Sequence, residues 1–319
     1  MEHTDNTKPL VSILIPTHER PHYFSLALAS VISQTYPNIE IVISDNSMDN
    51  DTETIVNNFR EKYTNIKYFH TPGLDMWGNW QKCWDNMSDD SQYVNFLMDD
   101  DIFAPTKIEK MVEQFISNPS LSLVTSYRMM VDKEGAPLPD GNFNKPITTS
   151  PTIIDGKKAG KYLLINCLNW IGEPTTVLFN RSLTDGFFKG WTGDEKYLIL
   201  DYPLWLRLLK KGDMFYIPEP LSFFRQHEVN DSKDFTTNVK GAISMALAIR
   251  HAWNNRIYIE TEEELKNTIF SWLKLSLGII DMCYADNYSG REFDDLLLVC
   301  KELCNAYTSR NVGMITYEF

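Results

Sequence analysis

The sequence has little positive charge for its size. Its 319 residues include 30 Lys and Arg against 43 Asp and Glu, which gives a formal net charge of −13 and a pI of about 4.9. This acidity argues against a nucleic-acid-binding protein that works by broad neutralisation of phosphates. An anionic small substrate stays compatible with it, because a metal ion or an Arg can reverse the local field of a small site.

Long apolar runs, export signals and paired cysteines are also missing. No apolar run reaches the roughly 18 residues of a membrane-spanning helix, since the most apolar stretch, 273–285, contains Lys274 and Asp281. The first ten residues lack the basic and apolar regions of a signal peptide, and the five cysteines form no C-x-x-C pair. We therefore expect a cytoplasmic protein with reduced thiols and no transmembrane segment.

The first third of the sequence alternates short apolar runs with amphipathic segments. The runs at 11–15, 39–43, 66–70 and 93–98 have the length and composition of strands, and the segments between them have helical spacing of apolar residues. Strands that alternate with helices predict an α/β protein with a mainly parallel sheet and helices on both faces. Such sheets bind ligands beyond the carboxyl ends of their strands, where this sequence carries polar and acidic segments.

The rest of the chain changes character towards its end. Further strands are predicted at 121–130, 175–180 and 214–224, helices at 104–116 and 202–211, and a long mobile loop at 132–160. Helical periodicity then dominates at 239–254, 262–284 and 292–309, and Thr261 to Glu264 form a capping box.

These patterns predict the domain organisation. Residues 1–9 form a polar tail and residues 10–235 form an α/β domain, followed by a helical C-terminal module at 236–319. The α/β domain divides into two halves, 10–130 and 131–235.

Three adjacent carboxylates, Asp99, Asp100 and Asp101, directly follow the predicted strand at 93–98. Adjacent carboxylates repel one another, so leaving them unpaired near the end of a buried strand is costly. Mg²⁺ and Mn²⁺ prefer carboxylate oxygens and leave coordination positions for substrate phosphates. The triplet therefore predicts a metal site, with a solvated surface turn as the alternative.

Several further motifs occur in a fixed order over residues 10–130. They are I-P-T-x-x-R-P at 15–21, A-S-V-I-S-Q-T-Y-P-N at 29–38, E-I-V-I-S-D-N-S at 40–47, Gly73, Asn79 and the acidic triplet, which is similar to D-x-D. Together they resemble the nucleotide-binding half of family 2 glycosyltransferases with the GT-A fold. The resemblance implies a mixed, mainly parallel sheet flanked by helices, and an inverting, metal-dependent transferase that uses a nucleotide sugar.

The resemblance also implies roles for single residues in the first half. The donor site would be lined by Pro16, Thr17, Glu19, Asp45, Asn79, Asp99 and Asp100. Among these, Asp45 would accept a hydrogen bond from the base, which is the uracil N3–H if the donor is a UDP-sugar. Mn²⁺ or Mg²⁺ would be held by Asp100, Asp101 and His227. Met98 stands where most relatives have the first Asp of the motif.

In the second half, residues 200–207, L-D-Y-P-L-W-L-R, resemble the family segment E-D-x-x-L-x-x-R. Its Asp is the general base, which maps to Asp201, although Leu200 replaces the usual Glu. A plain helix-capping role for Asp201, and a base at Asp194 or Glu195, are the alternatives.

Three further residues of the second half are candidates for the site. Phe224 to His227 resemble the later R-x-H segment, whose His can be a third metal ligand. Trp170 and Trp191 either stack on sugar faces or belong to the core.

The implied function is transfer of a sugar from a nucleotide-diphosphate sugar, a UDP-sugar by expectation, to a hydroxyl of a saccharide or glycolipid. This would serve polysaccharide biosynthesis in the cell envelope, with no nucleic-acid partner. Peripheral contact with the inner face of the membrane and a homo-oligomer are left open. The alternatives are a non-catalytic nucleotide- or carbohydrate-binding scaffold on the same fold, and a nucleotidyltransferase. The absence of a Gly-rich, basic loop after the first strand disfavours the nucleotidyltransferase.

Overall fold

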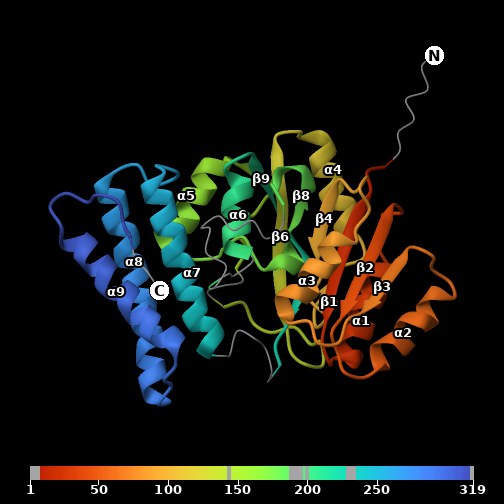
Figure 1. The fold of residues 1–319 in the computed structure, drawn as a ribbon. Helices are drawn as coiled ribbons and strands as arrows, with labels where there is room; N and C mark the ends of the chain where they lie inside the picture. The colour runs from red at the N-terminus through yellow and green to blue at the C-terminus, as the bar shows by residue number, and fades with distance from the viewer. Residues whose placement is uncertain (1–7, 142–144, 187–196, 198–200, 228–234, 317–319) are drawn as a thin grey trace. The chain divides into compact units, whose positions relative to one another are not determined.

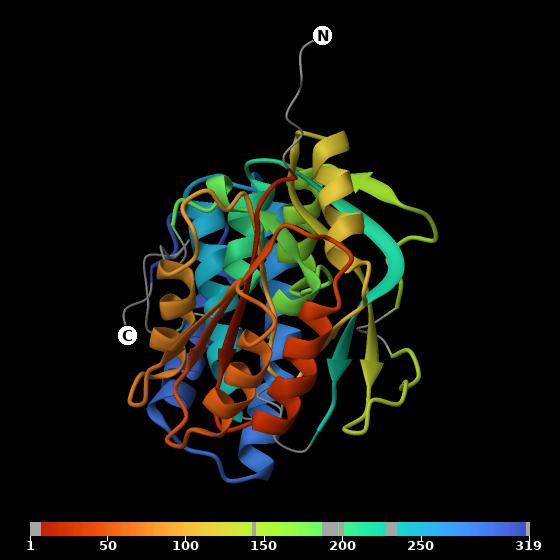
Figure 2. The same cartoon turned by 90° about the vertical axis from the view of Figure 1, so that its right-hand side faces the viewer.

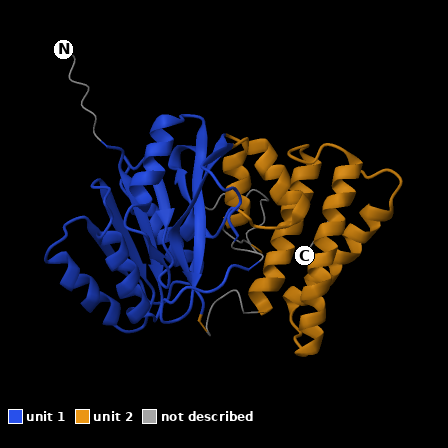
Figure 3. Cartoon of the chain, turned by 180° about the vertical axis from the view of Figure 1, so that it is seen from behind, with its two compact units in different colours: residues 1–153, 171–187, 212–226 blue, residues 154–170, 188–211, 227–319 orange. Residues whose placement is uncertain are grey.

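The computed structural model of the chain describes residues 8–141, 145–186, 197, 201–227 and 235–316. The chain divides into two units, each made of separated segments (Figure 3). Unit 1 consists of residues 1–153, 171–187 and 212–226, and unit 2 of residues 154–170, 188–211 and 227–319.

A mixed sheet forms the centre of unit 1. Its strands are β1 (Val11–Thr17), β2 (Ile39–Asp45), β3 (Ile66–His70), β4 (Tyr93–Phe96), β5 (Ile102–Phe103), β6 (Leu121–Val131), β7 (Thr152–Ile154), β8 (Leu178–Asn180) and β9 (Asp213–Arg225). They lie in the order β3-β2-β1-β4-β8-β6-β9-β5, and β7 pairs with β9 (Figure 1). The first four strands are parallel, as is the pair of β6 with β9, whereas β8 and β5 run antiparallel to their neighbours. The predicted mixed, mainly parallel sheet is therefore confirmed.

Helices cover both faces of this sheet. The helices of unit 1 are α1 (Pro21–Ile32), α2 (Asp51–Arg60), α3 (Met76–Asp85) and α4 (Lys107–Ser117). Apolar side chains of α1, α2 and α4 share one core with alternate residues of β1 and β2, such as Ile13 and Ile41. On α3, Trp80 stacks on Phe96 of β4 with ring centroids 4.8 Å apart, outside that core. Figure 2 shows α3 and α1 on opposite sides of the first strands of the sheet. All seven residues of β1 are buried, which explains why apolar residues occur on both of its faces.

Unit 2 is built from helices. They are α5 (Gly156–Asn166), α6 (Asp201–Leu209), α7 (Phe235–Asn254), α8 (Glu262–Ala285) and α9 (Arg291–Thr308). Between α8 and α7, the indole N–H of Trp272 donates a hydrogen bond of 2.7 Å to the Ala242 carbonyl. The capping box predicted before α8 is present, with the Thr261 side chain accepting from the Glu264 N–H. The three predicted C-terminal helices are confirmed.

The prediction of a long loop at 132–160 is wrong for the second part of this range, which contains β7 and the first turns of α5. The Asp155 side chain caps α5 by accepting a hydrogen bond from the Lys158 N–H. Two glycines made this helix resemble a loop in the sequence, but the packing of the helix explains why Gly160 is a glycine. A Cβ at this position would lie 2.4 Å from the Tyr258 ring, so only glycine lets that ring approach.

Two shorter segments also differ from expectation. The strand predicted at 175–180 is a 3₁₀ turn at Pro174–Thr176 followed by the short strand β8. The two-residue strand β5, directly after the acidic triplet, was not predicted. Both segments are shorter than the periodicity that identifies strands in a sequence.

The division into units is discontinuous, because residues 154–170 and 188–211 group with the C-terminal helices. The continuous boundary near residue 235 and the tail at 1–9 stay predictions. Among the described helices, α8 is long and apolar enough to cross a membrane by length and composition alone, with 28% of its most apolar window buried. A core helix of a soluble protein passes the same test, so the expected lack of a transmembrane segment also stays a prediction.

Candidate active site

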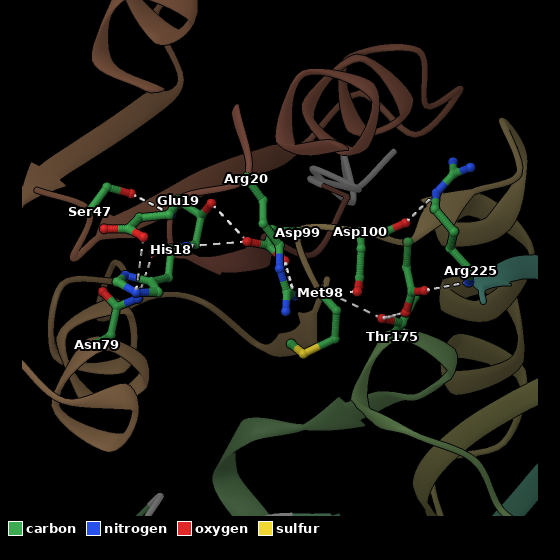
Figure 4. Close-up of polar contacts among 12 residues, drawn as sticks. His18, Glu19, Arg20, Ser47, Asn79, Met98, Asp99, Asp100, Thr175 and Arg225 are labelled. Atoms are coloured by element: carbon green, nitrogen blue, oxygen red, sulfur yellow. Dashed lines mark hydrogen bonds and ion pairs between the residues drawn. The ribbon is translucent and has the colours of Figure 1, made fainter. Parts of the chain in front are cut away.

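The loop after β1 holds the first two carboxylates of the acidic triplet (Figure 4). The Thr17 hydroxyl and the His18 N–H donate hydrogen bonds of 2.9 and 3.2 Å to Oδ2 of Asp99. Nη1 of Arg20 lies 3.4 Å from Oδ1 of Asp99 and 3.4 Å from Oδ2 of Asp100. The parallel pairing of β1 with β4 brings these two loops together at the carboxyl edge of the sheet.

The third carboxylate, Asp101, is fully buried and is held by the 3₁₀ turn Pro174–Thr176 and by β9. The Thr175 hydroxyl donates to its Oδ2 over 2.6 Å, and the Arg225 N–H donates to its Oδ1 over 3.0 Å. Thr175 also accepts a hydrogen bond of 3.1 Å from the Met98 N–H. Nε of Arg225 donates to the Asp100 carbonyl over 2.9 Å, so Arg225 holds both the backbone and the last carboxylate of the triplet.

Burial leaves the negative charge of the triplet only partly compensated. Desolvation, followed by the charge of Asp100, raises the pKa of Asp99 to about 6, against the opposing effect of Arg20. Desolvation raises the pKa of Asp101 well above its ordinary value, and the charges of Asp100 and Glu173 add to this. An added cation would therefore stabilise the ionised form of both carboxylates.

These carboxylates match the donor chemistry of a hard divalent cation. Adjacent carboxylate oxygens in a desolvated position are the ligands that Mg²⁺ or Mn²⁺ prefers. Both oxygens of Asp101 already accept hydrogen bonds, but each carboxylate oxygen has two lone pairs. Within the described ranges, no three His, Cys, Asp or Glu side chains are grouped to hold a metal ion. The residues thus fit the ion chemically, with fewer than three protein ligands in the described part of the chain.

Asp45, the candidate for base recognition, lies fully buried at the end of β2. Its Oδ1 accepts a hydrogen bond of 2.9 Å from the Ser47 N–H, and its Oδ2 accepts one of 2.9 Å from the Tyr68 hydroxyl. Glu19 is nearby in this network, since its N–H donates to the Ser47 hydroxyl over 2.7 Å. Glu19 has φ of 49°, a left-handed conformation that is uncommon for a residue other than glycine and often marks functional loops.

Asn79 on α3 connects the loops after β1 and β2. Its Nδ2 donates to the Thr17 carbonyl over 3.0 Å and to Oδ1 of Asn46 over 3.2 Å. Its own Oδ1 is buried and has no hydrogen-bond partner in the described structure. A buried acceptor without a donor is costly, so this atom is suited to an N–H or O–H of a ligand. Pro16 precedes Thr17 within β1 and is buried.

In unit 2, Asp201 is the first residue of α6. Its Oδ2 accepts a hydrogen bond of 2.7 Å from Nδ2 of Asn169, and its Oδ1 accepts one of 2.8 Å from the Tyr202 N–H. A carboxylate at the N-terminal end of a helix is stabilised by the helix dipole. The rival candidates Asp194 and Glu195, and Leu200 before Asp201, lie outside the described residues.

The remaining candidate residues belong to unit 2 or lie outside the residues that the structure describes. His227 is buried and belongs to unit 2, whereas the triplet belongs to unit 1. Trp170 contacts Tyr162 edge to face, with ring centroids 5.7 Å apart, and its indole nitrogen is buried without a hydrogen-bond partner among the described residues. Trp191 lies outside the described residues.

Several residues of the site were not singled out from the sequence. Arg20 and Arg225 lie within the I-P-T-x-x-R-P and R-x-H motifs, so a signal for both existed. Arg128 pairs with Glu173 at 2.6 Å, and both side chains are largely buried. For Thr175, nothing in the sequence indicated that it binds a carboxylate 74 positions earlier.

Comparison with known proteins agrees with this architecture. The model of the family described as glycosyl transferase family 2 matches residues 12–186. A 269-residue alignment with an uncharacterized glycosyltransferase of Rickettsia felis is 28% identical and covers 81% of this chain but only 40% of that protein. The GalNAc(5)-diNAcBac-PP-undecaprenol beta-1,3-glucosyltransferase of Campylobacter jejuni is 25% identical over 277 residues, which are 84% of this chain and 82% of that protein.

A solved structure shares the fold at low sequence identity. The crystal structure of residues 1–349 of S. aureus TarS in complex with UDP-GlcNAc superposes with a TM-score of 0.54 at 14% identity. The match covers 94% of this chain and 93% of that one. The predicted fold class is therefore confirmed.

Proposed function

The chain belongs to glycosyl transferase family 2, and from that premise we propose that it moves a sugar from a UDP-sugar to a hydroxyl group of a saccharide or glycolipid. The observation that supports this most is the arrangement at the carboxyl edge of the sheet. There Thr17, at the end of β1, and Arg20, in the loop that follows, contact Asp99 and Asp100 after β4. Ligands of open α/β sheets bind at this edge.

For the donor nucleotide, we propose that Asp45 and Asn79 recognise the base. Both present buried oxygen acceptors, and Oδ1 of Asn79 has no partner of its own in the described part of the chain. A uracil N3–H is a donor that such an acceptor can satisfy. TarS was solved with UDP-GlcNAc, which makes a UDP-sugar the first donor to test. Pro16, Thr17 and Glu19 would line the same site.

For the donor diphosphate, we propose that Asp100 and Asp101 would hold Mg²⁺ or Mn²⁺, with His227 as a further candidate ligand. When bound, the ion would supply Lewis-acid stabilisation of the charge that develops on the leaving diphosphate. Thr175 and Arg225 hold the Asp101 carboxylate in one orientation for this role. Asp99, which accepts a hydrogen bond from Thr17, would then contact the ribose of the donor nucleotide.

For the acceptor, we propose that Asp201 removes the proton from the attacking hydroxyl, and that direct displacement inverts the anomeric carbon. Asn169 fixes the orientation of this carboxylate. The Campylobacter relative is named for a saccharide carried on undecaprenol diphosphate, which supports a saccharide or glycolipid acceptor here.

We propose that the protein is cytoplasmic and can lie at the inner face of the membrane. Its proposed role is in cell-envelope polysaccharide synthesis. All five cysteines are free: Cys83, Cys167, Cys283, Cys300 and Cys304. Free thiols are typical of a reducing compartment.

A thermal-shift screen tests the donor assignment. The protein is heated with UDP-, GDP-, dTDP- and CMP-sugars, each with Mn²⁺ and with EDTA. We expect a UDP-sugar to raise the melting temperature most. A ligand present at 100 times its Kd stabilises the folded protein by about 2.7 kcal/mol, which such a screen detects. Asn79→Ala should reduce that shift, whereas Asn166→Ala, an exposed change on α5, should not. Binding without any release of sugar would instead indicate a non-catalytic scaffold.

A further inference from the structure

An exposed apolar face runs along α8 in unit 2. Phe270, Leu277 and Tyr284 recur at intervals of seven residues and are 53%, 61% and 63% exposed. Residues seven apart lie on the same side of a helix, so these side chains form one stripe. Phe270 also stacks on Tyr307 of α9, which is 39% exposed, and this widens the apolar surface. Monomeric proteins rarely leave such a continuous surface uncovered.

Two opposite charges lie on the same face of α8. Lys274 and Asp281 are exposed and, like the apolar residues, are seven positions apart. Neither makes an ion pair with another residue in the described ranges; Lys274 only approaches the Phe270 ring, at 5.9 Å from its centroid. Gly278 lies between them, and a Cβ at this position would meet no atom within 4 Å. At 3.6 residues per turn Gly278 lies at the edge of this face, where it adds no side chain that would hinder a partner. Leu277, which is 61% exposed, lies between the two charges on the face itself.

We propose that this face binds a second copy of the same chain, with the two α8 helices antiparallel about a two-fold axis near Gly278. In such a symmetric interface, residue i meets residue j and residue j meets residue i. Lys274 then lies opposite the partner subunit's Asp281, and Asp281 lies opposite the partner subunit's Lys274. The apolar residues at both ends of the stripe meet in the same way, with Phe270 against the partner subunit's Tyr284.

Charge complementarity favours a second copy over a membrane surface. A copy of this helix supplies both opposite charges at the required spacing, whereas hydrocarbon would leave Lys274 and Asp281 without partners. The first turn of α8 carries Glu262, Glu263 and Glu264, and the whole chain has a net charge of −13. Anionic lipid headgroups would repel these groups.

The expected dimer is reversible. A helix of 24 residues is about 36 Å long, and the proposed interface rests on one pair of such helices with few apolar side chains. Its association should therefore depend on protein concentration, and it should respond to single charge reversals.

Sedimentation equilibrium of the full chain over a concentration series tests the proposal. Wild type should approach twice the monomer mass. Lys274→Asp and Asp281→Lys each turn two symmetry-related attractions into repulsions, so each should weaken dimerisation by on the order of tenfold or more. The double variant, Lys274→Asp with Asp281→Lys, restores opposite charges and should restore the dimer. Glu61→Lys, an exposed charge reversal at the end of α2, should have no effect.

Circular dichroism shows that each variant is folded before it is compared. A wild-type chain that stays monomeric at all concentrations would overturn the proposal. So would a dimer that both single variants form with the affinity of wild type, because that dimer would use another surface. Binding of the monomer to phosphatidylethanolamine–phosphatidylglycerol vesicles that is lost in Leu277→Lys would also overturn it, in favour of a membrane-facing helix.

Discussion

Asn169 donates a hydrogen bond of 2.7 Å from its side-chain amide to Oδ2 of Asp201. The Tyr202 N–H donates to the other oxygen over 2.8 Å, so the direction of the whole carboxylate is fixed. In the proposed reaction, the acceptor hydroxyl would therefore meet a carboxylate whose orientation is set. Asn169 is therefore a positioning residue for the proposed base.

Replacement of Asp201 tests the proposed base itself. Asp201→Asn keeps the size of the side chain but removes its ability to take a proton. Transfer should fall by about 10² to 10⁴-fold, the usual contribution of a general base. The affinity for UDP, measured by isothermal titration calorimetry, should stay within about twofold. Full transfer activity in this variant would show that the base is another residue.

Replacement of Asn169 tests positioning. Asn169→Ala should slow transfer by on the order of tenfold and shift the pH–rate profile, because the carboxylate is no longer held. In the Asp201→Asn background the same change should have almost no further effect, since residues that act as a unit are not additive. An equal loss in both backgrounds would mean that Asn169 acts independently of Asp201. Asn166→Ala on α5 is the control.

Thr175 should matter for stability as well as for the site. Thr175→Val keeps the shape but removes the hydroxyl that donates to Asp101 and accepts from the Met98 N–H. Leaving buried polar groups without partners costs about 1–3 kcal/mol, which urea unfolding would measure. Thr175→Ser retains the hydroxyl and should lose less than half of this. Equal stability of wild type and the Val variant would argue against this hydrogen-bond network.

Glu264 predicts a specific pH dependence of stability. Its hydrogen bond from Lys161, followed by the Glu260 and Thr261 N–H groups, lowers its pKa to about 2 from an ordinary value of 4.5. The folded state therefore favours the ionised form, so this stabilisation is present above pH 4.5 and is lost as the pH falls towards 2. Glu264→Gln should lower the melting temperature at pH 7, and the difference from wild type should shrink below pH 4.5.

The matched control for that experiment is Glu263→Gln. This change removes a charge from the same helical turn, but among the described residues Glu263 makes no ion pair with α5. A difference between wild type and Glu264→Gln that stays constant down to pH 3 would contradict the role of the ion pair.

The sequence predicts the strands that lead to the site better than it predicts the contacts of Asp101. The strands that lead to Thr17, Asp45 and Asp99 were identified because parallel strands buried on both faces are rich in apolar residues. The partners of Asp101 were not, because Thr175 and Arg225 lie 74 and 124 positions away and only the sheet order brings them close. A sequence pattern carries local periodicity, whereas such contacts depend on the tertiary fold.

The same limit explains the missed helix α5. Its sequence, G-K-K-A-G-K, has the glycines and charges of a loop, and its helical state depends on packing. Gly160 lies against the Tyr258 ring and Lys161 pairs with Glu264, contacts that no local propensity reveals.

The most direct test of the central claim is the release of UDP from UDP-sugars by the purified chain in the presence of Mn²⁺. A coupled assay follows UDP with and without a saccharide or polyprenyl-diphosphate-linked acceptor, before and after addition of EDTA. We expect UDP release from at least one donor, an increase with acceptor, and loss with EDTA that excess Mn²⁺ reverses. Release at the same rate in EDTA would contradict the proposed metal site at Asp100 and Asp101. No release from any nucleotide sugar, by a folded protein that binds UDP, would contradict the proposed transferase activity.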